Sequence, residues 1–169
     1  AQKGIMAMTG LSFVIGRTAE VEKSKNYPVR SFYCNLYQQY AGFEKNGEMR
    51  FTPPVQTVYA AIQGLKEYYA EGEMPKHERH LRVNRAIHEG VAKLGLKEAI
   101  KPEIQSGLVV SVLYPDDPAW DFGKVHDYCY ERGFTIYPGK ISSSGTFRLC
   151  SLGAIDESDI KDFFVVFTE

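Results

Sequence analysis

The second half of the chain carries the feature that most constrains the fold, an alternation of helical and strand patterns. Apolar residues recur there at helical spacing over long stretches, and short apolar runs separate these stretches. The resulting order is helix, strand, helix, strand, strand, helix, which suits helices packed on one face of a small antiparallel sheet. We expect strands at 107–114, 134–137 and 146–151, and helices at about 75–94, from 121 and from 156.

Individual residues mark the ends of these elements. Asp121 is placed to cap the helix that follows it, while Gly95 and Gly133 are suited to end the helices that precede them. The apolar residues of the first of these helices that we expect to point inward are Leu81, Ile87, Val91 and Leu94.

Charged and histidine residues in the same helix raise the question of a metal site. His77 and His80 lie three residues apart, with Glu78 between them, but no strong third ligand lies nearby. No cysteine pair has zinc spacing. We therefore expect no metal site, and we expect these residues to form a solvated helix face together with Arg79, Arg82 and Arg85.

The first half of the chain has fewer regular patterns. Residues 11–15 form a short apolar run typical of a buried strand, and Thr18 is placed to cap a short helix that continues to Lys25. Residues 26–49 are rich in aromatic residues and irregular. A helix then opens at Thr52-Pro53-Pro54, with Val58, Ile62, Leu65 and Tyr69 at helical spacing and Gly72 as its stop.

One strand, a long connection and one helix are too few elements for a two-layer core. We therefore predict that residues 1–74 are the remnant of a larger α/β domain. Residues 75–169 are predicted to form a small domain, with the boundary near 71–75.

Composition excludes several partners. The 20 Lys and Arg balance the 21 Asp and Glu, and a net charge of −1 gives no electrostatic reason to expect binding to nucleic acid or to an anionic membrane. No apolar run approaches the roughly 20 residues that a membrane span needs. Three widely spaced cysteines fit reduced thiols, so we expect a cytoplasmic protein.

Lys3 is the first candidate for chemistry. Small and apolar residues follow it as far as Ile15, and an ammonium buried in such a setting has a lowered pKa. A neutral amine is a nucleophile that forms a Schiff base with an aldehyde. On the residues alone, a surface lysine before a strand explains the same pattern.

Thr52 and Arg148 are the other two candidates. If Thr52 is the N-cap, its hydroxyl accepts a hydrogen bond from the Val55 amide and can still donate its proton to a phosphate oxygen. The helix dipole also attracts the phosphate. Arg148 lies between two apolar strand residues and offers a planar fork to a carboxylate. A plain N-cap, and a strand arginine in water or paired with a structural acid, are the alternatives.

The order of three segments then resembles a known family. These segments are Lys3 with the apolar run after it, Arg50-Phe51-Thr52-Pro53-Pro54, and Tyr137-Pro138-Gly139-Lys140 followed by Phe147-Arg148-Leu149. In this order and at these separations, the chain is similar to the carboxyl-terminal half of the class V (fold type I) pyridoxal-phosphate aminotransferases. The similarity runs from Lys3 to about Phe167.

The resemblance implies a cofactor, pyridoxal 5'-phosphate, and a role for each candidate. Lys3 matches the Schiff-base lysine that also shuttles the proton, Thr52 matches a residue that binds the cofactor phosphate of the neighbouring subunit, and Arg148 matches the arginine that binds the substrate carboxylate. The family often has a tyrosine shortly before this threonine, whereas this chain has Met49, Arg50 and Phe51 there.

The resemblance also implies a homodimeric parent enzyme that acts on a small-molecule amino donor and a 2-oxo acid. The likeness is greatest to family members that use 2-aminoethylphosphonate and pyruvate. Serine– or alanine–glyoxylate aminotransferases and desulfurases of the same class remain alternatives.

In this family the phosphate-binding glycine loop, the residue that stacks on the cofactor ring and the acid partner of the pyridine nitrogen all precede the lysine. We therefore expect this chain to be a fragment that is inactive by itself. A non-catalytic α/β ligand-binding or interaction module is the other hypothesis.

Overall fold

A computed structural model describes residues 2–139 and 144–169 of the chain. Lys140, the last residue of one of the family segments, lies outside the described residues. The chain divides into two compact units, Ala1–Lys66 and Glu67–Glu169, which are considered separately below. The boundary predicted between residues 74 and 75 concerns the parent fold and remains a prediction.

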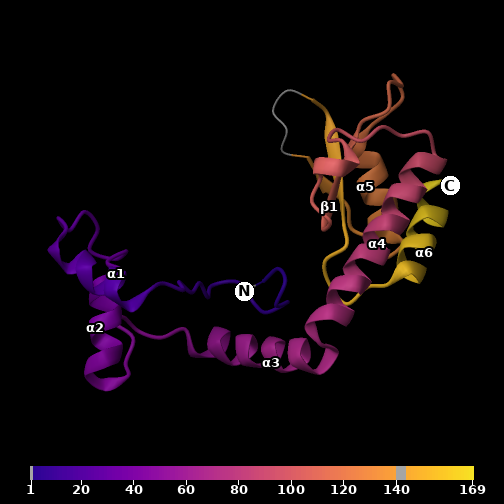
Figure 1. Cartoon of the computed structure of the whole chain (residues 1–169). Helices are drawn as coiled ribbons and strands as arrows, with labels where there is room; N and C mark the ends of the chain where they lie inside the picture. The colour runs from indigo at the N-terminus through magenta and orange to yellow at the C-terminus, as the bar shows by residue number, and fades with distance from the viewer. Residues whose placement is uncertain (1, 140–143) are drawn as a thin grey trace. The chain divides into compact units, whose positions relative to one another are not determined.

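The second unit contains a three-stranded antiparallel sheet in the order β1-β3-β2. In the register of the sheet, Arg148 is opposite Ser111 on one side and Tyr137 on the other. Helices α4 and α6 lie side by side next to this sheet (Figure 1). The strands are β1 (Val109–Leu113), β2 (Tyr137–Pro138) and β3 (Thr146–Cys150), and the helices are α4 (Glu73–Lys93), η2 (Pro102–Ile104), α5 (Phe122–Glu131) and α6 (Glu157–Phe167).

One hydrophobic core joins the sheet to these helices. Phe147 of β3 is fully buried, and its ring lies 5.7 Å from that of Phe167 and 5.9 Å from that of Trp120. The predicted fold of helices on a small antiparallel sheet is confirmed. The buried apolar residues of this core are Val83, Ile87, Val91, Val110, Val112, Cys129, Ile136, Phe147, Leu149, Ile160 and Phe163.

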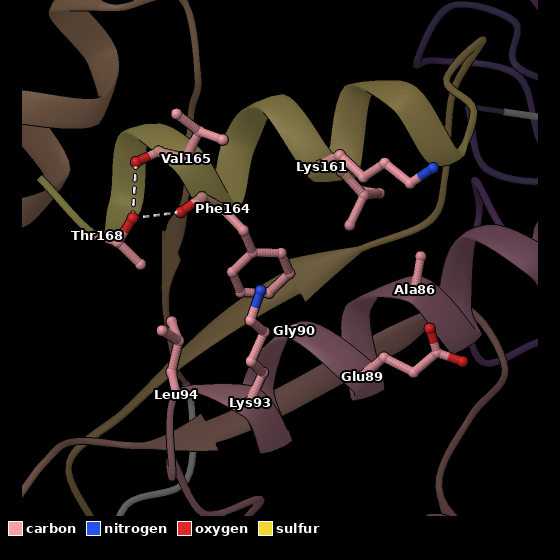
Figure 2. Close-up of a pocket in the computed structure, with 10 residues that line it drawn as sticks. Ala86, Glu89, Gly90, Lys93, Leu94, Lys161, Phe164, Val165 and Thr168 are labelled. Carbon is pink, nitrogen blue, oxygen red and sulfur yellow. Dashed lines mark hydrogen bonds between the residues drawn. The ribbon is translucent and has the colours of Figure 1, made fainter.

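The contact between α4 and α6 depends on a glycine. The ring of Phe164 lies over Gly90, as Figure 2 shows. A Cβ atom at position 90 would overlap that ring. Gly90 therefore allows the two helices to approach each other closely.

Local signals fix the ends of the helices in this unit. Asp121 Oδ1 accepts a hydrogen bond from the Lys124 amide at 3.2 Å, so the predicted cap is confirmed. Asp156 forms a capping box with Asp159 at the start of α6. Gly133, just after α5, has a φ of +89°, which glycine adopts without strain.

Two predictions about α4 are wrong. Leu81 is 41% exposed, although Ile87 and Val91 are buried as expected. The face expected to be solvated is partly covered, since His80 is 7% exposed and its Nδ1 lies 2.8 Å from the Ser151 carbonyl oxygen. The covering segment, which follows β3, is more than 70 residues away in the sequence and gave no local signal.

The first unit consists of helices and extended segments. A helix that the sequence did not predict spans residues 36–46: the Asn35 side chain caps it by accepting from the Gln38 amide at 3.0 Å, and Gly47 ends it with a φ of +74°. Thr18 is the first residue of its helix and not the cap. The elements of this region are α1 (Thr18–Lys23), η1 (Ser24–Asn26), α2 (Leu36–Asn46) and α3 (Val55–Glu71), the last of which continues into the second unit.

The strand predicted at residues 11–15 is not formed. Phe13, Val14 and Ile15 have no regular secondary structure and are 62%, 66% and 90% exposed. A strand requires a hydrogen-bonded neighbour, and residues 2–66 contain no strand that could pair with this segment. The apolar run by itself was therefore an insufficient basis for predicting a strand.

The helix α3 is confirmed, but its burial differs from that of an ordinary amphipathic helix. Ala61 and Gly64 are buried, whereas Ile62 and Leu65 are 44% and 38% exposed. Gly64 lies against the chain near the amino terminus, because a Cβ atom there would be 2.8 Å from the Ile5 carbonyl oxygen.

Candidate functional site

Lys3 lies in a turn at the start of the first unit. Its carbonyl accepts a hydrogen bond from the Met6 amide at 2.9 Å, and Met6 has a positive φ of 58°. The next residues pack on α3 at Gly64, so the turn is tied to that helix. The side chain of Lys3 is exposed, and the buried setting expected from the sequence is not found.

Thr52 precedes α3 but does not cap it. The helix begins at Val55, and the Val55 amide donates to the Pro53 carbonyl at 2.9 Å and not to the Thr52 hydroxyl. The first helical hydrogen bond runs from the Val58 amide to the Pro54 carbonyl at 3.0 Å. The predicted N-cap is therefore wrong, because the two prolines shift the helix start by two residues and leave Thr52 exposed.

Arg50 is a contact centre that the sequence did not predict. Its Nη1 donates to the Phe32 carbonyl at 2.9 Å, and its guanidinium carbon lies 4.6 Å from the Phe32 ring centroid and 5.1 Å from that of Phe51. The Arg50 amide donates to Gln39 Oε1 of α2 at 3.3 Å. A sequence signal existed, since an arginine among aromatic residues is a typical cation–π partner.

Arg148 lies in the middle of β3, between the buried residues Phe147 and Leu149, and is itself partly exposed. The predicted alternation is therefore present. Its Nε donates to the Pro138 carbonyl at 3.1 Å, which uses one of the five N–H groups and orients the guanidinium. Arg148 also borders a cavity of about 400 Å³ whose other lining residues include Tyr137, Cys150 and Leu152.

A second cluster of charges lies near the start of α4. Arg79 forms a bidentate pair with Glu71 at 2.7 and 3.1 Å and donates to the carbonyls of Gly153 and Ile155 at 2.9 and 3.2 Å. The hydrogen bonds from Arg79 hold the pKa of the Glu71 carboxyl below its usual range. This cluster ties α4 to the segment after β3, and we assign it a structural role.

The three predicted site residues are distributed over both units. Lys3 and Thr52 belong to the first unit and Arg148 to the second. Among residues 2–139 and 144–169, no group of three His, Cys, Asp or Glu side chains is arranged to hold a metal ion. Within the same residues, every helix is too short or too polar to cross a bilayer.

Comparisons with known proteins identify relatives of this chain. No protein-family model matches it. The 2-aminoethylphosphonate–pyruvate transaminase of Phocaeicola vulgatus is 37% identical to it over 163 residues, which are 95% of this chain and 44% of the relative. The chain thus spans less than half the length of that relative.

Solved structures show the same fold. An alanine–glyoxylate aminotransferase from a Nostoc species matches with a TM-score of 0.82 at 18% identity, covering 98% of this chain and 45% of that protein. A PLP-bound phosphoserine aminotransferase from Trichomonas vaginalis matches with a TM-score of 0.65 at 22% identity, over 84% and 40% of the two chains. The resemblance to the carboxyl-terminal part of the class V aminotransferases is confirmed.

Proposed function

We propose that this chain is the carboxyl-terminal part of a pyridoxal-phosphate-dependent transaminase that moves the amino group of 2-aminoethylphosphonate to pyruvate, giving phosphonoacetaldehyde and alanine. The observation that carries the proposal is the 37% identity to a transaminase of that name along 95% of the chain. The fold that the chain shares with an alanine–glyoxylate aminotransferase also supports the proposal.

The residues present fit the cofactor. Lys3 offers an exposed amine on a turn that is tied to α3, so the amine is available to a cofactor aldehyde. Thr52 offers an exposed hydroxyl that can donate to a phosphate oxygen. When bound, pyridoxal 5'-phosphate supplies the electron sink for the substrate α-carbon.

Each residue then has a defined task. Lys3 would hold the cofactor, and its amine would move the proton to and from the substrate carbon that bears the amino group. Arg148 binds the carboxylate of pyruvate, because the hydrogen bond from its Nε to the Pro138 carbonyl leaves the Nη1–Nη2 end of the fork for a bidentate contact. Thr52 serves the cofactor of a second copy, so the proposed enzyme is a homodimer.

Part of the proposed enzyme must come from outside these 169 residues. In the family that the chain resembles, the residues that stack on the cofactor ring and pair with its pyridine nitrogen precede the lysine. We therefore propose that the 169-residue chain, tested alone, has no transaminase activity.

The experiment uses a reconstituted complex, made by mixing this chain with a polypeptide that supplies the remaining part of the Phocaeicola vulgatus relative. Pyridoxal 5'-phosphate is added, the complex is reduced with borohydride, and the labelled residue is located by mass spectrometry. We expect the label on Lys3, no label in Lys3→Arg, and an unchanged label in the matched control Lys25→Arg.

The substrates are tested in the same complex. We expect alanine to form from pyruvate with 2-aminoethylphosphonate as the amino donor, and faster than with serine. We also expect Arg148→Lys to raise the KM for pyruvate, because an ammonium lacks the planar fork. A folded complex that carries no label on Lys3 would refute the proposal and favour a non-catalytic module.

A further inference from the structure

We infer that Arg50 is a positioning residue: its guanidinium, packed against Phe32 and Phe51, fixes the peptide that presents the Thr52 hydroxyl to the cofactor phosphate. The inference rests on the proposed function, because it assumes that Thr52 binds that phosphate. It concerns residues 27–58 of the first unit only.

The guanidinium joins two segments that are far apart in the sequence. Arg50 lies 4.6 Å from the Phe32 ring centroid and donates to the Phe32 carbonyl, which is 18 residues away. The Phe51 ring packs at 5.7 Å from that of Phe32 and at 5.2 Å from that of Tyr33. Cation–π contacts of this kind contribute about 0.5–1 kcal/mol at exposed sites, and a planar guanidinium makes them better than an ammonium does.

This cluster is not part of a hydrophobic core. The side chains of Phe32 and Tyr33 are 73% and 75% exposed, and only Ala61 and Gly64 are buried among the described residues of this unit. Besides the contacts of the Phe51 ring with Phe32 and Tyr33, little packing surrounds the guanidinium, so its loss is poorly compensated.

The backbone of Arg50 is also anchored. Its amide donates to Gln39 Oε1. Gly42 of α2 lets the turn before Arg50 approach this helix, because a Cβ atom at position 42 would lie 3.2 Å from the Glu48 carbonyl oxygen. The chain on the amino-terminal side of Thr52 is thus attached to α2 through its backbone and to Phe32 through its side chain.

The chain on the other side of Thr52 is equally constrained. Pro53 and Pro54 have fixed φ angles, and the residue before a proline is restricted to extended conformations. The hydrogen bonds to the Pro53 and Pro54 carbonyls attach these prolines to the start of α3. Thr52 therefore lies between two anchored segments, Arg50 with Phe51 before it and the two prolines after it.

The contacts of the guanidinium favour positioning over direct binding of the phosphate. Its Nη1 is used by the Phe32 carbonyl, and its face is covered by aromatic rings. Arg50 also occupies the stretch in which the family often has a tyrosine before the threonine. Because this chain lacks the phosphate contact of that tyrosine, phosphate binding depends more strongly on the placement of Thr52.

The test compares two cofactor forms in the reconstituted complex, and its readout is binding and not turnover. Dissociation constants are measured for pyridoxal 5'-phosphate and for pyridoxal, which lacks the phosphate. We expect Thr52→Val and Arg50→Lys each to weaken binding of the phosphorylated form about tenfold, with binding of pyridoxal unchanged. Arg30→Lys, in an exposed part of the same unit, is the matched control and should bind both forms normally.

The double variant decides between the two roles. If Arg50 acts through Thr52, Arg50→Lys in a Thr52→Val background causes no further loss. Losses that multiply, or an Arg50→Lys variant that binds normally, would overturn the inference.

A second measurement on the 169-residue chain alone is independent of the cofactor. We expect Arg50→Lys to speed hydrogen exchange of the amide at position 50, which donates to Gln39 Oε1, at least threefold relative to its rate in Arg30→Lys. Unchanged exchange at this amide would overturn the inference. A failure of this test can be told apart from a failure of the proposed function, because the borohydride labelling of Lys3 does not depend on Arg50.

Discussion

Both units of this chain contain helices, but they contain very different amounts of core. The described residues 67–139 and 144–169 bury eleven apolar residues in one cluster, whereas the described residues 2–66 bury only Ala61 and Gly64. Apolar residues are not missing from the first unit, since Phe13, Val14 and Ile15 are present and exposed. The comparison teaches that helices form wherever caps and periodicity are present, while a core needs partners that the local sequence does not supply.

The largest test of this difference removes the central side chain of the core. Phe147→Ala should lower the free energy of unfolding of the second unit by about 3–5 kcal/mol, because it deletes a fully buried ring and leaves a cavity. Chemical denaturation, followed by the fluorescence of the single tryptophan and by circular dichroism, measures the change. A loss below 1 kcal/mol would show that this core is not the source of stability.

The next test concerns the contact between α4 and α6. Gly90→Ala should destabilise the second unit by about 1–3 kcal/mol, because the added methyl group overlaps the Phe164 ring. Figure 2 shows that ring above Gly90. The double variant Gly90→Ala/Phe164→Leu should recover part of the loss in the same denaturation assay. Gly95→Ala is not a suitable control, because Gly95 has a φ of +68° and an alanine there would be strained.

A third test uses pH. The pKa of Glu71 is lowered in the folded chain by its hydrogen bonds with Arg79, so the stabilisation is complete above the unfolded pKa and is lost as the pH falls through the folded one. Glu71→Gln should therefore cost about 1–2 kcal/mol at pH 7 and less at pH 3. The pKa of Asp156 is also lowered, by hydrogen bonds from Ser158, so only the difference from wild type is informative.

The smallest effect is expected in the first unit. Phe13→Ser should change the free energy of unfolding by less than about 0.5 kcal/mol, because the ring is 62% exposed and loses little contact. The same variant in the reconstituted complex should destabilise it, if the rest of the parent fold covers this segment. Equal losses with and without the second polypeptide would contradict the contrast between the units.

The helices that could be predicted are those whose signals lie within a few residues of each other. Asp121 and the periodic residues after it predicted α5 correctly, and the repeat through Ile87 and Val91 predicted α4. The helix α2 was missed, although Asn35 and Gly47 mark its ends, because the aromatic residues around it suggested irregular structure.

The chemistry of the candidate site stays a prediction, and its geometry did not follow from the sequence. The order of the three segments that contain Lys3, Thr52 and Arg148 indicated the family, but the exposure of Lys3 and the start of α3 at Val55 did not follow from the local pattern. The environment of Arg50 could not be predicted either, because its ring and carbonyl partner is Phe32, 18 residues away.

The sequence by itself located helices α4, α5 and α6 and strands β1 and β3 of the second unit and indicated the family, because caps, periodicity and motif order act over short distances along the chain. The strand predicted at residues 134–137 is found only at Tyr137–Pro138. Only the tertiary structure decided which apolar residues are buried, that His80 lies beneath the segment after β3, and that Phe32 packs against Arg50. Burial and such contacts depend on residues distant in sequence, and no local pattern records which distant residues will meet.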